Sequence, residues 1–63
     1  LLFPSLTSVD STSFGASAGT SIFKDCTALT EIHFRADMQA TIEAMSRYEN
    51  KWGATNASII FDL

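Results

Sequence analysis

The sequence contains only one cysteine, one histidine and one proline among its 63 residues. Cys26 alone cannot form a disulfide within the chain, and Cys26 with His33 is too small a set for a structural zinc site. A domain of this length buries only about 60% of its unfolded surface and usually needs such a staple. The chain also begins with apolar residues 1–3 and no Met. We therefore expect it to be a piece of a longer protein whose core continues upstream.

Basic residues are also scarce, because four Lys and Arg stand against seven Asp and Glu and leave a net charge of −3. They form no cluster that could neutralise phosphates, so we expect no nucleic-acid partner. No apolar run approaches the roughly 20 residues of a membrane span, and we expect no membrane insertion. No Gly-rich phosphate loop or Gly-x-Ser-x-Gly turn is present. We therefore expect no enzyme, cofactor or metal site.

A five-residue pattern recurs in the chain, since residues 5–9 (Ser-Leu-Thr-Ser-Val) return 23 positions later as residues 28–32 (Ala-Leu-Thr-Glu-Ile). This period is typical of leucine-rich repeats, which run about 20 to 29 residues. The alignment places Phe3 opposite Cys26, and the second copy extends to Phe34. Residues 59–61 repeat the apolar, variable, aromatic order of residues 32–34. The pattern predicts three repeat strands.

The segment between the first two predicted strands is rich in Ser and Thr, which favour turns over regular pairing. We expect an irregular loop in residues 5–21, with Phe14, Ile22 and Phe23 anchored in the core. A disordered linker would lack such apolar anchors.

Apolar residues then follow helical spacing, which predicts a helix over about residues 37–51. Asp37 is the expected N-cap, Glu43 and Arg47 the expected i,i+4 pair, and Gly53 the expected stop. The face that should cover the core consists of Met38, Ile42, Met45, Tyr48 and Trp52. An aromatic sugar platform is the alternative reading of Tyr48 and Trp52, but this spacing more often indicates a core face.

A closing strand is predicted at about residues 57–62 from its β-branched and aromatic content. A strand, a helix and a strand in this order predict a right-handed parallel crossover. The fold class is therefore α/β, with a short parallel sheet and one capping helix.

Residues 22–34 resemble the repeat unit of BspA-like leucine-rich-repeat proteins. The matching core positions are Phe23, Cys26, Leu29, Ile32 and Phe34. Residues 36–63 are similar to the helical segment and final strand that often end such arrays. Two departures are Ile22 in place of the usual Ala and Arg35 in place of the usual Pro.

The resemblance implies a solenoid fragment, with repeat units in residues 1–34 and a C-terminal structural cap in residues 35–63. It implies a protein-interaction or adhesion module of a bacterial cell-surface or secreted protein, whose partner is a protein or surface glycan. The alternative is a structural spacer or decoration domain of a virion or surface layer. A hydrolase remains possible only if catalytic residues lie upstream.

The candidate binding face is the outward side of the predicted sheet. It comprises Glu31, His33, Arg35, Ser58, Ile60 and Asp62, with Ser8 and Asp10 beside them. The competing interpretation is a solvated sheet face that binds nothing. Cys26 is expected to be buried beneath Leu29 on the opposite side of the sheet, which argues against a Cys26–His33 nucleophile and base.

Overall fold

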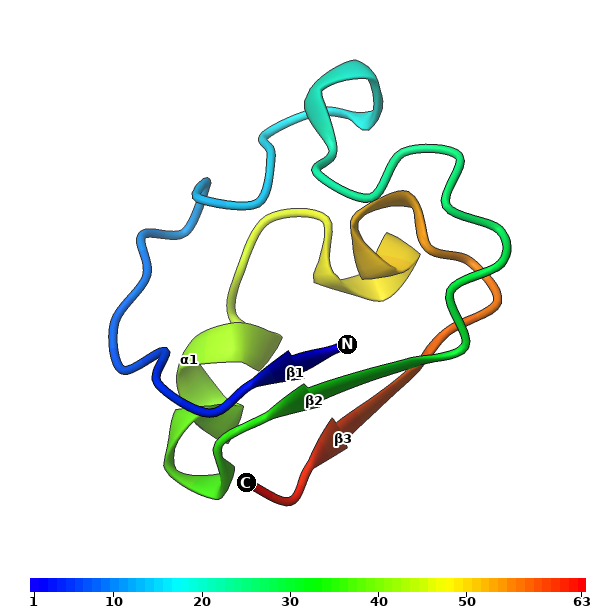
Figure 1. Ribbon diagram of the computed structural model, residues 1–63. Helices are drawn as coiled ribbons and strands as arrows, with labels where there is room; N and C mark the ends of the chain where they lie inside the picture. Colours follow the sequence, from blue (N-terminus) through cyan, green and yellow to red (C-terminus); the bar gives the residue numbers. More distant parts are fainter.

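A three-stranded parallel sheet organises the computed structural model, which describes all of residues 1–63 (Figure 1). The strands are β1 (Leu2–Phe3), β2 (Glu31–Phe34) and β3 (Ser58–Phe61), and they lie in chain order. Both strand pairs are parallel, so the α/β class and the parallel crossover from β2 to β3 are confirmed. The predicted closing strand is also confirmed within one residue at each end.

Alternation along β2 separates a buried side of the sheet from an outward side. Ile32 and Phe34 have no exposed surface, whereas Glu31 is exposed and His33 is half-buried between them. This is the two-residue period expected when one face of a strand packs on a core. The register pairs Phe34 with Phe3 on one side and with Phe61 on the other. Three phenylalanines therefore occupy one row across the inner face.

The predicted register of the first repeat is wrong. It placed Phe3 opposite Cys26 and Val9 opposite Ile32, whereas Phe3 pairs with Phe34. The reason is aromatic packing, since the Phe3 and Phe34 rings stack with centroids 5.2 Å apart and planes 7° apart. Val9 packs on the core from the following loop instead of from a strand.

The connection from β1 to β2 is mostly irregular, as expected, and contains one 3-10 turn, η1 (Ala18–Thr20). Phe14 and Phe23 anchor it, being 7% and 9% exposed. The expected third anchor, Ile22, is wrong because its side chain is 53% exposed. Its backbone is held by a hydrogen bond from its N–H to the Phe14 carbonyl, while the side chain faces away from the core.

The single helix predicted over residues 37–51 is wrong. The chain forms η2 (Ala36–Met38), a short helix α1 (Gln39–Glu43) and, after a turn, η3 (Tyr48–Gly53). A continuous helix cannot run through this segment, because Arg47, Lys51 and Trp52 take left-handed φ angles of 66°, 54° and 50°. None of these helices is long and apolar enough to cross a membrane.

The predicted N-cap and the predicted ion pair of this helix are also wrong. Asp37 lies inside η2 instead of capping a helix, and Glu43 forms no ion pair with Arg47. Gly53, however, does end η3, at φ 99°.

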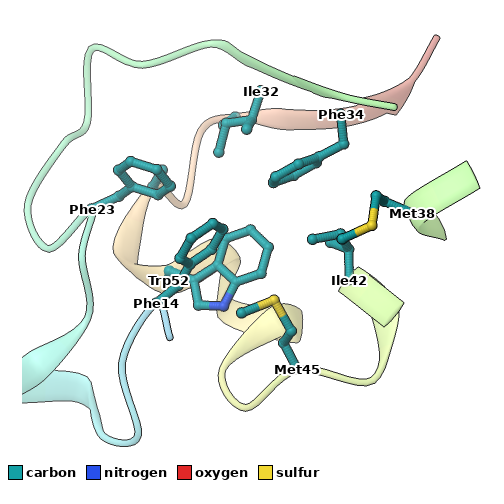
Figure 2. Close-up of a cluster of buried hydrophobic side chains, with 10 residues drawn as sticks. Phe14, Phe23, Ile32, Phe34, Met38, Ile42, Met45 and Trp52 are labelled. Carbon is teal, nitrogen blue, oxygen red and sulfur yellow. The ribbon is translucent and has the colours of Figure 1, made fainter. Parts of the chain in front are cut away.

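Four of the five predicted face residues are nevertheless buried around Trp52, and only Tyr48 is half-buried (Figure 2). Trp52 has no exposed surface, meets the Phe14 ring edge-on at 5.0 Å, and donates its Nε1–H to the Ser46 carbonyl at 3.0 Å. The expectation that Trp52 belongs to the core is therefore confirmed. The buried core comprises Phe14, Phe23, Ile32, Phe34, Met38, Ile42, Met45, Trp52, Ala54 and Ala57.

Replacing Trp52 by Ala should lower the free energy of unfolding by about 3 to 5 kcal/mol, because it empties the centre of the core and frees the Ser46 carbonyl. Urea melts followed by circular dichroism measure this loss. Ile22→Ala, at an exposed position, is the control and should stay within about 0.5 kcal/mol of the wild type. Equal unfolding free energies for the two variants would contradict the placement of Trp52 in the core.

Gly53 permits a close crossing of two backbone segments. Phe23 donates its N–H to the Trp52 carbonyl at 2.9 Å, and a Cβ on Gly53 would lie 2.6 Å from the Lys24 Cα. Because Gly53 also has a φ of 99°, a side chain there would be strained twice over.

We expect Gly53→Ala to destabilise the fold by more than about 1 kcal/mol, as alanine at positive φ does. Gly19→Ala is the matched control, since Gly19 has open space around its Cα and no left-handed φ. That variant should be neutral or more stable by up to about 1 kcal/mol, through a smaller unfolded-state entropy. Thermal melts measure both effects. If Gly53→Ala lowered the melting temperature no more than Gly19→Ala, the close backbone crossing at Gly53 would be contradicted.

Candidate functional site

His33 on β2 is the centre of a three-residue polar cluster on the outward side of the sheet. Its Nδ1 lies 2.8 Å from Asp62 Oδ1, and its Nε2 lies 2.8 Å from Glu31 Oε1. Glu31 shares the outward side of β2 because it lies two residues before His33. Asp62 arrives from the end of β3, because the register pairs His33 with Ile60. The structure thus brings together three of the six residues predicted for the binding face.

Both ring nitrogens of His33 face carboxylate oxygens, and only the imidazolium can donate to both. The hydrogen bond with Asp62, followed by that with Glu31, raises the pKa of His33 above its ordinary value, with a smaller opposing contribution from desolvation. In that state the three side chains carry a combined charge of −1. With both nitrogens engaged, the ring has no free lone pair for a metal or for accepting a proton.

The cluster therefore acts as a connection between strands. It ties β2 to the chain leaving β3, where the Leu63 N–H also donates to the Phe34 carbonyl at 3.1 Å. The side chain of His33 is 17% exposed, against 57% for Glu31 and 51% for Asp62. The carboxylates thus retain free oxygen surface toward solvent while holding the ring.

The other three residues predicted for the binding face do not all lie together. Ser58 pairs with Glu31 and Ile60 with His33, so both lie on the outward side of the sheet. Arg35 instead forms a two-bond pair with Asp37, with Nε 3.0 Å from Oδ1 and Nη2 2.8 Å from Oδ2. This pairing raises the pKa of Arg35 and lowers that of Asp37.

Ser8 and Asp10 are not neighbours of this face, contrary to the prediction. Both lie in the loop after β1, where the Asp10 N–H donates to the Ser13 hydroxyl at 2.8 Å. Their place beside His33 is taken by Leu2, which pairs with it in register. The sequence reasoning missed Leu2, although matching the aromatic Phe3 with Phe34 would have placed it there. The outer sheet face, as we use the term, comprises Leu2, Glu31, His33, Ser58, Ile60 and Asp62.

Cys26 is exposed, so its predicted burial beneath Leu29 is wrong. It lies in a tight turn in which its N–H donates to the Phe23 carbonyl at 3.0 Å and Asp25 takes a left-handed φ of 61°. This turn lets Phe23 fill the core while the thiol faces solvent. Leu29 is only half-buried, packing against the edge of the core.

The surface contains no detectable pocket, and no group of three or more His, Cys, Asp and Glu side chains is placed to hold a metal ion. The candidate site is therefore an exposed surface, the outer sheet face, and not a cavity. Comparisons with models of protein families, with curated proteins and with solved structures find no match to this chain.

The His33 cluster should make stability depend on pH above the range in which carboxylates titrate. Because the pKa of His33 is raised on folding, its contribution is fully present below the unfolded value of about 6.5 and is lost as the pH rises through the folded value. We therefore expect the unfolding free energy to fall as the pH rises above about 6.5. Urea melts across this range measure the fall.

His33→Gln is the control for this dependence, since glutamine can donate hydrogen bonds but does not titrate. Its stability should be nearly flat over the same range. A wild-type protein that is equally flat, or that gains stability as the pH rises, would contradict the doubly bonded imidazolium.

Proposed function

We propose that this chain is part of a protein-interaction or adhesion module of leucine-rich-repeat type, belonging to a bacterial cell-surface or secreted protein. The observation that carries the proposal is the aromatic column across the sheet. Phe3, Phe34 and Phe61 come from three successive strands and stack with centroid distances of 5.2 and 5.9 Å. Such stacking of equivalent positions is how repeat coils share one core.

The topology supports the same proposal. The three strands are parallel and lie in the order in which the chain makes them, so each connection returns the chain to the same end of the sheet (Figure 1). In a solenoid each coil contacts only its neighbours in this way. Residues 4–30 and 35–57 would be the convex parts of two coils.

The two sides of the sheet then have separate roles. The inner side builds the core, and residues 35–63 serve mainly as structure, since Met38, Ile42, Met45 and Trp52 are buried. The outer sheet face is held rigid by the His33 cluster and presents carboxylates beside Leu2 and Ile60. A rigid scaffold that presents exposed polar and apolar groups suits recognition of a protein or surface glycan. This role requires no catalysis.

Site-specific photocrosslinking in the cell that makes the protein tests this proposal. A benzoylphenylalanine at Ser58, which is exposed on the outer sheet face, should yield a crosslink to another macromolecule. The same group at Ala18, exposed on η1 in the loop, is the matched control and should yield none. Identical products from both positions, or no product from Ser58, would contradict recognition through this face.

A further inference from the structure

The ring of His33 has a carboxylate oxygen at each of its two nitrogens. Nδ1 lies 2.8 Å from Asp62 Oδ1, and Nε2 lies 2.8 Å from Glu31 Oε1. The imidazolium can donate to both oxygens, whereas the neutral ring has one N–H and must present a lone pair to the other carboxylate. An acceptor and a carboxylate cannot share a hydrogen bond without a proton between them. Loss of the ring proton therefore breaks one of the two bonds.

The two carboxylates are not held equally. Asp62 directly follows Phe61, whose place is set by its pairing with Phe34 in the sheet, and its bond to Nδ1 contributes most to the raised pKa of His33. Glu31 has one more side-chain torsion, so holding it in one position costs more conformational entropy. The neutral ring should therefore keep its proton on Nδ1, retain Asp62 and lose Glu31.

Two further charged groups lie close to this cluster. Arg35, two residues along β2, is bound by Asp37 through two hydrogen bonds, and both stay ionised at neutral pH because the pKa of Arg35 is raised and that of Asp37 is lowered. The α-amino group of Leu1 donates to the Glu31 carbonyl at 3.1 Å. Such amino groups titrate at about pH 8, so acetylation removes this second titration. Neither β1 nor β3 contains a charged residue.

We propose that His33 is a pH switch for the Glu31 carboxylate, holding it while the ring is charged and releasing it to the outer sheet face when the ring is neutral. Release changes the combined charge of the three side chains from −1, for two carboxylates and one imidazolium, to −2. Glu31 pairs with Ser58 in register, so the freed carboxylate becomes an acceptor for a partner on this face. This consequence rests on the proposed function, since it makes recognition through the outer sheet face depend on pH.

NMR of the folded chain follows the switch directly, because His33 is the single histidine. The sample is isotope-labelled, acetylated at its N-terminus and titrated from about pH 5.5 to about pH 9. We expect the neutral ring to carry its proton on Nδ1, as the shifts of the two ring nitrogens report. The side-chain carboxyl carbon of Glu31 should shift with the same midpoint as the ring, and that of Asp62 should shift less.

Asp62→Asn should reverse the choice of nitrogen. A side-chain amide can donate to an Nδ1 lone pair, so the neutral ring should carry its proton on Nε2 and continue to hold Glu31. The Glu31 carboxyl carbon should then lose most of its shift at the ring midpoint. Asp10→Asn makes the same change in the loop after β1 and should titrate like the wild type. Circular dichroism verifies that each variant is folded.

The consequence for recognition is measured with the photocrosslinker at Ser58. Its yield should rise several-fold between about pH 5.5 and about pH 8.5, because one charged hydrogen-bond acceptor becomes available to the partner. In a His33→Gln background the yield should be the same at both pH values, since glutamine does not titrate.

The inference is overturned by a wild-type neutral ring that carries its proton on Nε2, or by a Glu31 carboxyl carbon that does not shift with the ring. A Ser58 yield that is equal at both pH values would overturn its consequence for recognition. Failure of the proposed function gives a different result, namely no Ser58 crosslink at any pH. The NMR titration needs no partner and decides the switch in that case as well.

Discussion

Phe34 is the residue through which the separate parts of this small chain are held together. It has no exposed surface, and its ring contacts Phe3 at 5.2 Å, Phe61 at 5.9 Å, Trp52 at 6.0 Å and Phe14 at 6.2 Å. These four rings come from β1, β3, η3 and the loop before β2. Because the chain has no disulfide, cooperative packing of this kind must supply the stability that small domains often obtain from covalent links.

The sequence predicts burial better than it predicts the backbone that achieves it. The spacing of Met38, Ile42, Met45 and Trp52 correctly identified core residues, but a continuous helix did not follow. Residues that turns bring to one core can show helical spacing. No feature of the local sequence predicts that Arg47 takes a left-handed conformation. Likewise, the five-residue repeat aligned Phe3 with Cys26, whereas the Phe3 ring stacks on Phe34.

The candidate site shows the same division. The alternation in β2 correctly predicted that Glu31 and His33 share the outward side, because that depends only on strand period. The bond from His33 to Asp62 joins residues 29 positions apart and requires the register of β3 to within one residue. Leu2 was missed for the corresponding reason, since its place depends on the register of β1. Long-range register is a property of the packed core and not of any short pattern.

Packing on Phe34 makes the three strands one cooperative unit, and amide hydrogen exchange can measure this cooperativity. The His33 N–H bonds across to Leu1 and the Ser58 N–H bonds across to Thr30, so each reports a different strand pair. We predict that both amides exchange slowly and with the same opening free energy, equal to that of global unfolding. Fast exchange at His33 beside slow exchange at Ser58 would show that β1 opens independently, which would contradict a single unit built around Phe34.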